Sequence, residues 1–220
     1  MKSICSANDP MKLIVVTSPD YFEGEGRLIN EFFAEGLGLL HLRKPGNDAL
    51  KFRQLMMEID PEYYPAISIH QHHELADEFS LRRLHFTAQH RKLMVSGDLN
   101  DLSEQGFYLS SSVHGLIELT DLSKINRTTE ENLSSFDYFF YGPVFNSISK
   151  KGYHSQLDDD FILPPHLIKV IAIGGVQSDR LVKLKRMNFD GAAVLGTIWH
   201  QKEHPVTAFK KIIKAILELK

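Results

Sequence analysis

The sequence predicts an α/β protein made of a single (β/α)8 TIM barrel. Eight short apolar runs alternate with amphipathic helical patterns, which is typical of a parallel sheet with right-handed crossovers. The runs are almost continuously hydrophobic, as strands buried on both faces are. Gly-rich turns follow the last two runs, where a barrel of this class builds its phosphate site. An open doubly wound sheet is the alternative, but eight units and the terminal turns favour closure.

The strands are expected at residues 12–17, 39–43, 66–70, 83–87, 106–110, 138–141, 169–173 and 191–195. Helices are expected where apolar residues recur every three or four positions between these runs. Those residues are Leu28, Ile29, Phe32 and Phe33 after the first strand, Phe52, Leu55, Met56 and Ile59 after the second, Leu181, Leu184 and Met187 after the seventh, and Val206, Phe209, Ile212, Ile213, Ile216 and Leu217 after the eighth. Asp48 is the expected cap of the second helix and Ser178-Asp179 of the seventh.

Two of the eight units depart from this pattern. Residues 89–105 show little helical periodicity and contain Ser96-Gly97-Asp98, so we expect a degenerate fourth helix. Residues 125–135 are polar and are expected to form a loop.

The composition is ordinary for a soluble globular protein, with 43% hydrophobic and 24% charged residues in 220. A net charge of −3 gives no electrostatic case for binding nucleic acid or an anionic membrane. No stretch approaches the length of a transmembrane helix, and the N-terminus lacks the apolar core of a signal peptide. We therefore expect a cytoplasmic protein.

One domain is expected, with residues 1–10 as a flexible N-terminal extension and residues 11–220 as the barrel. Met11 is an alternative start. Cys5, in the extension, is the only cysteine, which excludes a disulfide framework and a thiolate metal site.

Reactive residues of a (β/α)8 barrel lie at the C-terminal ends of its strands. We expect this mouth to be formed by residues 41–45, 70–73, 87–91, 110–115, 142–152, 174–178 and 195–199. At the end of the second strand, period-two alternation puts His41 and Arg43 on one face, toward the barrel interior. A forked guanidinium there suits a carboxylate or a phosphate, and an internal salt bridge is the alternative.

Histidines dominate the ends of the third and fourth strands. Only His70 is expected to face inward, whereas His72 and His73 are expected to begin a solvated helix. His85 either joins His41 and His70 inside the barrel or is a hydrogen-bonded core histidine. Neighbouring histidines are compatible with a metal, but no Cys, Asp or Glu accompanies them at a familiar ligand spacing, so we predict no metal site.

Two further groups of polar residues are expected at the mouth. Ser112 and His114 follow the fifth strand, where an imidazole can transfer protons near neutral pH; capping or a structural role is the alternative. Ser147, Ser149 and Lys150, after the sixth strand, offer hydroxyls and an ammonium to anionic oxygens, unless they form a solvated loop.

The phosphate cradle is expected at Gly174, Gly175, Leu195 and Gly196. Glycines after a strand allow backbone N–H groups to approach an anion, and a helix starting beyond adds its positive end. The alternative is that Gly174 and Gly175 only make a tight turn.

Taken together, these residues resemble the thiamine-phosphate synthase family and its relatives, the TenI-type thiazole tautomerases. The matching segments are residues 40–43 (LHLR), 112–114 (SVH), 137–145 (DYFFYGPVF) with Ser147, Ser149 and Lys150, 171–176 (IAIGGV) and 190–194 (DGAAV). The resemblance implies a (β/α)8 fold, a homodimer and a small-molecule site for thiazole phosphate, with the phosphate on Gly174, Gly175, Leu195 and Gly196.

The chain departs from the synthases of this family where they bind Mg²⁺. Their Asn-Asp pair after the third strand aligns with His70-Gln71, and no acid occurs from residue 79 to residue 97. Their lysine two positions beyond the arginine aligns with Pro45, for which Lys44 is the nearest replacement, and their glutamine two positions before it aligns with His41. Since Mg²⁺ depends on carboxylate ligands, these departures speak against the metal-assisted reaction.

The departures fit a TenI-like tautomerase, which the resemblance implies needs no cofactor and uses a histidine at the position of His114. Arg43 would engage a carboxylate, and His41 is expected to be catalytic as well. The residues expected to bind substrate are His70, Ser112, Ser147, Ser149 and Lys150. A divergent thiamine-phosphate synthase using Mg²⁺, held by pyrophosphate and by Asp98 or Asp101, is the second reading. A silent thiazole-phosphate binding protein is the third.

Overall fold

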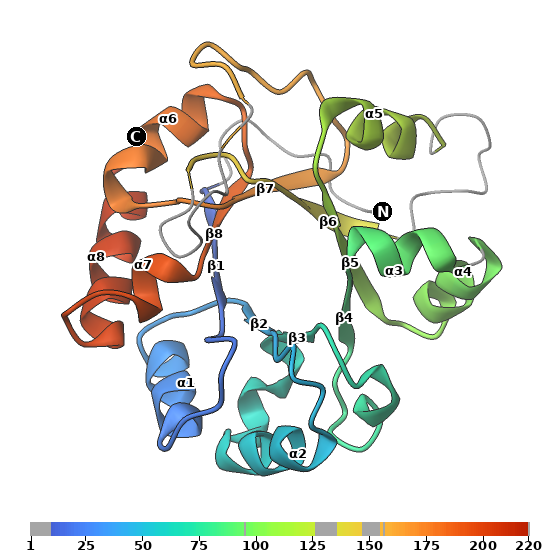
Figure 1. Cartoon of the computed structure of the whole chain (residues 1–220), viewed down its shortest axis with the longest axis vertical. Helices are drawn as coiled ribbons and strands as arrows, with labels where there is room; N and C mark the ends of the chain where they lie inside the picture. Colours follow the sequence, from blue (N-terminus) through green and yellow to red (C-terminus); the bar gives the residue numbers. More distant parts are fainter. Residues whose placement is uncertain (1–9, 95, 126–135, 147–154, 156, 220) are drawn as a thin grey trace.

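The computed structural model describes residues 10–94, 96–125, 136–146, 155 and 157–219. Eight parallel strands close into a barrel in the order β1 to β8, so the predicted fold class is confirmed (Figure 1). The strands are β1 (Lys12–Val16), β2 (Leu40–Leu42), β3 (Ile67–Ile69), β4 (Arg83–Phe86), β5 (Tyr108–Val113), β6 (Phe136–Tyr141), β7 (Lys169–Ile173) and β8 (Gly191–Val194). β1 closes the ring by pairing with β8, with Lys12 opposite Gly191.

The helices lie around the outside of the barrel, because each strand must return to the same edge before the next one begins (Figure 1). They are α1 (Glu25–Ala34), α2 (Ala49–Glu58), α3 (Ala88–Leu93), α4 (Ser96–Glu104), α5 (Leu116–Ile125), α6 (Leu181–Arg186), α7 (Gly196–Trp199) and α8 (Pro205–Leu217). Single 3₁₀ segments are η1 (Pro61–Ala66), η2 (His73–Leu75) and η3 (Ser178–Arg180). None of the described helices is long and apolar enough to cross a membrane.

The caps of two predicted helices turned out differently. The Asp48 carboxylate accepts a hydrogen bond from Lys51 N at 3.0 Å, which confirms Asp48 as the cap of α2. The prediction that Ser178-Asp179 caps this helix, α6, is wrong. These two residues belong to η3 instead, and Arg180 precedes α6 without a side-chain cap.

The unit expected to be degenerate contains two helices, α3 and α4. Thr87 caps α3 by accepting from His90 N at 3.1 Å. The inward face of α3 is made by Arg91, whose guanidinium donates to the Ser111 hydroxyl at 2.6 Å and to the Glu118 carboxylate at 2.6 Å. The sequence shows no apolar periodicity here because the buried residue of α3 is Arg91, which is paired with polar groups, and not an apolar side chain. The polar segment expected as a loop lies outside the described residues, apart from Ile125 at the end of α5.

Strand β5 covers residues 108–113 rather than the predicted 106–110. Gly106 adopts φ 87°, the left-handed region that ends α4 and starts the turn into the strand. Ser112 therefore lies inside the strand, and only His114 follows its end.

Two apolar cores flank the barrel wall. The larger lies between strands and helices, and the smaller fills the barrel interior with Ile14, Val16, Tyr138, Phe140, Ile171 and Ala193. Alternation along β6 turns Tyr138 and Phe140 inward and Phe139 and Tyr141 outward. The same alternation on β2 turns His41 inward, as predicted, where its ring packs against Phe140 with centroids 4.5 Å apart.

A titratable pair joins β7 and β8 at their N-terminal ends. His166 Nε2 lies 2.9 Å from a carboxylate oxygen of Asp190, and Val170 N donates to the same oxygen at 2.7 Å. The hydrogen bond to Asp190 raises the pKa of His166 above its usual value, since it favours the charged imidazolium.

This pair predicts a pH-dependent contribution to stability. Because the pKa of His166 is higher in the folded state, the ion pair stabilises the fold fully below the pKa of the unfolded state, about 6.5. This stabilisation is lost as the pH rises through the pKa of the folded state. The loss of unfolding free energy on His166→Asn should therefore be larger at about pH 5.5 than at about pH 8.5. Urea unfolding of both proteins at the two pH values measures it. An equal loss at both values would contradict the charged pair.

Candidate active site

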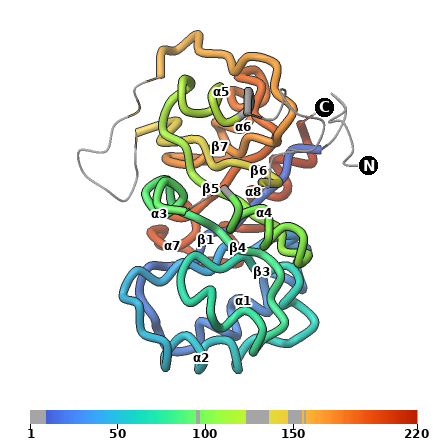
Figure 2. Tube along the Cα trace, turned by 90° about the vertical axis from the view of Figure 1, so that its right-hand side faces the viewer, coloured from blue at the N-terminus to red at the C-terminus, as the bar shows by residue number. Residues whose placement is uncertain are grey.

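The candidate site lies at the C-terminal mouth of the barrel, where the predicted residues of β2, β3, β4 and β5 meet. Figure 2 views the barrel from the side, with α1 and α2 on one side of the barrel and α5 and α6 on the opposite side. Ser147, Ser149 and Lys150 lie outside the described residues, so their predicted role stays a prediction.

Three histidines gather inside the barrel, as the sequence suggested. His41 Nδ1 and His70 Nε2 are 2.9 Å apart, and His41 Nε2 is hydrogen-bonded to the Tyr138 hydroxyl. His85 lies with Nδ1 2.9 Å from the Ser110 hydroxyl and Nε2 3.0 Å from that of Ser112. Every ring nitrogen of His41 and His85 thus has a partner.

Burial holds these histidines in their neutral form. Desolvation lowers the pKa of His41 and His70 well below the usual value and that of His85 to about 3, and neighbouring histidines and arginines act in the same direction. Neutral imidazoles can be metal ligands, and one ligand atom from each ring lies within 4.8 Å of the others.

Ring orientation argues against one metal ion bound by all three. The rings of His70 and His85 are stacked, with centroids 4.0 Å apart and an interplanar angle of 27°. A histidine binds a metal through a lone pair in the plane of its ring. Nearly parallel planes at this separation do not converge at a metal–nitrogen distance of about 2.1 Å. The arrangement fits hydrogen bonding within the cluster better than shared ligation.

Two neighbouring cations at the end of β2 have opposite surroundings. Arg43 is half-buried, and no described residue accepts a hydrogen bond from its guanidinium. Burial lowers the pKa of Arg43, and the charge of Arg43 in turn lowers the pKa of His70 and His85. Among the residues that the structure describes, Arg43 forms no ion pair, so the alternative of an internal salt bridge stays open.

Lys44 is fully buried, and its side chain reaches the loop between β1 and α1. Its ammonium lies 2.6 Å from both carboxylate oxygens of Glu25 and donates to the carbonyls of Ser18 and Asp20 at 2.9 and 3.0 Å. It packs over the Tyr21 ring at 4.6 Å. With its hydrogen-bonding capacity satisfied, Lys44 cannot replace the synthase lysine that aligns with Pro45.

His72 and His73 begin only the short 3₁₀ segment η2 and are not solvated, so the prediction of a solvated helix is wrong. His72 is buried, with φ 57°, and its Nδ1 lies 3.2 Å from Glu74. His73 opens the short η2 and its ring nitrogen bonds the Ile69 carbonyl at 3.1 Å. The turn after β3 is too tight for a full helix, which draws both rings back onto the barrel.

His114 is exposed at the end of β5 and has a fixed ring. Its Nδ1 lies 2.8 Å from the Gly142 carbonyl, so Nδ1 carries the hydrogen and Nε2 keeps its lone pair when the ring is neutral. The His114 backbone N–H donates to Glu118 at 3.0 Å, and Arg91 holds the other carboxylate oxygen at 2.6 Å. No described residue bonds Nε2, which is the state required of a proton-transfer group.

The two Gly-containing turns lie side by side. Gly174 and Gly175 adopt φ 97° and 63°, and the Thr197 hydroxyl beside Gly196 donates to the Val176 carbonyl. Among the described residues, no hydrogen bond is donated by the N–H of Gly175 or of Gly196. Leu195 directly precedes α7, and Gly196 is its first residue. Phosphate binding here stays a prediction.

The tight turn also has a packing reason. A Cβ on Gly175 would lie 2.3 Å from the Asn146 carbonyl oxygen, and one on Gly174 would lie 2.8 Å from Pro143. Both glycines are thus required by the close approach of the β6–β7 loop. Gly175→Asp would disturb this packing as well as repel an anion, so it cannot test phosphate binding alone.

A charge change beside the turn gives a cleaner test. Gln177→Glu adds a negative charge two residues beyond Gly175 with nearly the same shape. We expect roughly a tenfold loss of affinity for thiazole phosphate, because like charges repel across a partly desolvated site. Gln105→Glu, at the end of α4, is the matched control. Equal affinities of the two variants for thiazole phosphate in calorimetric titrations would contradict phosphate binding at this turn.

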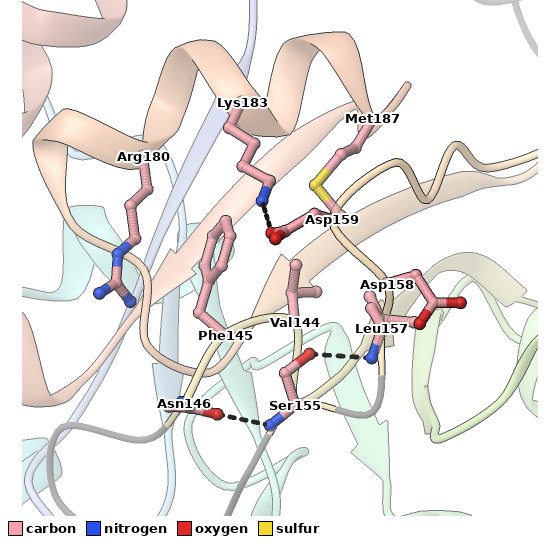
Figure 3. A pocket seen from close by; sticks show the side chains of 10 residues that line it. All are labelled: Val144, Phe145, Asn146, Ser155, Leu157, Asp158, Asp159, Arg180, Lys183 and Met187. Carbon is pink, nitrogen blue, oxygen red and sulfur yellow. Dashed lines mark hydrogen bonds and ion pairs between the residues drawn. The ribbon is translucent and has the colours of Figure 1, made fainter.

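A cation beside the turn at Gly174 and Gly175 was missed in the sequence analysis. Arg180 donates from Nη1 to the Gly175 carbonyl at 2.7 Å, and its guanidinium lies 5.1 Å from the Phe145 ring centroid. The sequence feature that could have identified Arg180 is its position shortly after Gly174-Gly175. Figure 3 shows Arg180 and Lys183 on one wall of a pocket of about 580 Å³, with Lys183 paired to Asp159 at 2.7 Å. This pocket lies beside α6 and does not include the histidine cluster.

Solved structures of known proteins have a similar fold. A TM-score of 0.66 relates the chain to a thiamine phosphate pyrophosphorylase of Bacteroides thetaiotaomicron, 26% identical, over 96% of this chain and 99% of that one. One from Pyrococcus furiosus is 17% identical with a TM-score of 0.68, over 95% and 96% of the two chains, which shows the fold alone.

Sequence comparison gives the family. A thiamine-phosphate synthase of Haemophilus influenzae strain PittEE is 34% identical over 84 residues, and so is that of strain 86-028NP. These matches span only 34% of this chain and 37% of each relative. The family model described as TMP-TENI, thiamine monophosphate synthase, matches residues 13–198. This match covers most of the chain and agrees with the barrel fold. The chain therefore belongs to the thiamine monophosphate synthase/TenI family of thiamine biosynthesis.

Proposed function

We propose that this protein is a TenI-like tautomerase, which isomerises thiazole phosphate carboxylate to its aromatic tautomer by acid–base proton transfer without a metal. His114 transfers the proton through Nε2, and Arg43 binds the carboxylate. The turns at Gly174, Gly175, Leu195 and Gly196 hold the phosphate. The protein is proposed to act as a homodimer on this small molecule.

The observation that carries the proposal is the chemistry at the ends of β3 and β4. His70-Gln71 and the segment Thr87 to Arg91 provide imidazole, amide and guanidinium groups but no carboxylate. Mg²⁺ prefers oxygen ligands and usually needs one or two carboxylates besides the phosphates of a substrate. Arg91 adds a buried positive charge that is already paired with Glu118. A site of this composition supports acid–base proton transfer better than the synthase reaction, in which Mg²⁺ assists pyrophosphate as the leaving group.

His114 and Arg43 supply what the isomerisation requires. The Gly142 carbonyl fixes the His114 ring and leaves Nε2 without a partner among the described residues. The Arg43 guanidinium likewise has no described acceptor, so it can form a forked pair with a carboxylate without first breaking a contact.

Thiamine-phosphate synthase is the second candidate, favoured by the names of the relatives and of the solved structures. It would have to bind Mg²⁺ through pyrophosphate oxygens and distant acids such as Asp98 and Asp101 of α4. A protein that binds thiazole phosphate without turnover is the third.

One assay distinguishes the three. Pure protein is incubated with thiazole phosphate carboxylate, first alone and then with pyrimidine pyrophosphate and Mg²⁺. We expect aromatisation without metal, unchanged by EDTA. Formation of thiamine phosphate that EDTA abolishes and Mg²⁺ restores would replace the proposal with the synthase. Saturable binding without either product would indicate the binding protein.

A further inference from the structure

A chain of hydrogen bonds leads from the barrel mouth into its interior. Its outer member is His70 at the end of β3, which keeps 9% exposure, whereas His41 is fully buried. His70 Nε2 bonds His41 Nδ1 at 2.9 Å, and His41 Nε2 bonds the Tyr138 hydroxyl. No described residue bonds His70 Nδ1, which is therefore the free end of the chain.

The chain gives His70 a defined tautomer. When His41 Nε2–H donates to Tyr138, His41 Nδ1 accepts from His70 Nε2–H, and His70 Nδ1 keeps its lone pair. When Tyr138 donates instead, every bond reverses and His70 Nδ1 carries a hydrogen. Because each nitrogen of a neutral imidazole is either donor or acceptor, the Tyr138 hydroxyl determines which form the outer ring adopts.

His85 holds the His70 ring in place without joining the chain. Both its ring nitrogens are taken by Ser110 and Ser112, and its ring stacks on His70 at 4.0 Å. Ser112 lies on β5 two residues before His114. His70 and His114 thus stand on the same side of the mouth, connected through β4.

The electrostatic surroundings keep His70 neutral until an anion binds. The charged and titratable groups that act on it are His85, His41, Arg43 and His73, and all of them, like burial, lower its pKa. A ligand carrying a phosphate and a carboxylate brings negative charge into the mouth and offsets these effects.

We propose that His70, oriented by His41 and Tyr138, is a second proton-transfer group of this site. The inference rests on the proposed tautomerase function, because an isomerisation removes a proton from one ring atom and adds one to another. His70 Nδ1 takes the proton from the first ring atom of the substrate, and the electron pair of the broken bond stays in the substrate ring. Protonated His114 then gives its Nε2 proton to the second ring atom. Substrate and product have the same composition, and the two histidines return to their starting states by exchange with water.

His41 and Tyr138 are positioning residues in this scheme. When His70 becomes cationic, its Nε2–H donates to His41, whose own Nε2–H donates to Tyr138. The bonds polarise in one direction, which stabilises a charge that burial alone would disfavour.

Turnover of thiazole phosphate carboxylate by four proteins tests the proposal. His70→Asn is expected to lower it by about 10²–10⁴-fold, and Tyr138→Phe by about tenfold. Tyr138→Phe removes one oxygen, so it spares the fold, and Tyr141→Phe is its matched control because that tyrosine is also buried on β6 but faces outward. In ¹⁵N NMR spectra of the free proteins, only Tyr138→Phe should shift the His70 ring nitrogens.

Each outcome decides one question. An inactive wild type would remove the proposed function, whereas an active wild type with a fully active His70→Asn variant would overturn this inference alone. Unchanged His70 nitrogen shifts and turnover in Tyr138→Phe would overturn the positioning role. If His70→Asn fails to fold, as thermal unfolding reveals, the comparison of Tyr138→Phe with Tyr141→Phe still decides.

Discussion

His114→Asn is expected to lower the turnover of thiazole phosphate carboxylate by about 10²–10⁴-fold and to change ligand affinity little. The neutral His114 ring presents an Nε2 lone pair because Nδ1–H donates to the Gly142 carbonyl at 2.8 Å. Asparagine keeps a polar side chain of similar reach but cannot exchange protons. The proposed phosphate turns and Arg43, to which the proposal assigns ligand binding, are untouched by this substitution. Steady-state kinetics and calorimetric titration of the same preparations measure the two effects separately.

His204→Asn is the matched control for this variant. His204 is exposed before α8, where its side chain makes no cap hydrogen bond, and asparagine suits such a position. Wild-type turnover is expected. If His114→Asn retains full activity while His41→Asn or His70→Asn loses it, the proton-transfer group lies on β2 or β3. Full activity of all three variants would refute acid–base catalysis by these histidines.

Lys44→Met is expected to lower the free energy of unfolding by about 3–5 kcal/mol, because it leaves the Glu25 carboxylate buried without its partner. The Lys44 and Glu25 side chains are 0% and 1% exposed. Burial raises the pKa of Glu25 to about 7 even beside the ammonium, so an isolated carboxylate there is costly. Urea unfolding monitored by circular dichroism measures the loss.

The double variant Glu25→Gln/Lys44→Met separates the pair from the packing. With both charges removed, the loss should be smaller than for Lys44→Met alone. Lys51→Met is the surface control, since its contact with Asp48 at 3.8 Å is exposed and contributes little. A loss below about 1 kcal/mol would show that Lys44 is not held as a buried ion pair.

The sequence by itself determined the barrel and the residues that reach its mouth. Eight apolar runs buried on both faces, separated by helical patterns, leave few other ways to cover a parallel sheet. Alternation along β2 correctly turned His41 inward, and the order of strands put His70, His85 and His114 at one end. These features follow from local periodicity, which a single chain displays without any knowledge of its contacts.

Only the tertiary structure decided what those residues touch. Glu25 and Lys44 are 19 residues apart and no local pattern pairs them, yet closure of the barrel buries them together. His41 meets Tyr138 across 97 residues, and Arg91 meets Glu118 across 27. The sequence predicted a histidine cluster but not its hydrogen-bonded chain, nor the stacking that opposes shared metal ligation. Such contacts join different strands and helices, so no local pattern encodes them; they arise when the sheet closes and desolvation makes each buried polar atom find a partner.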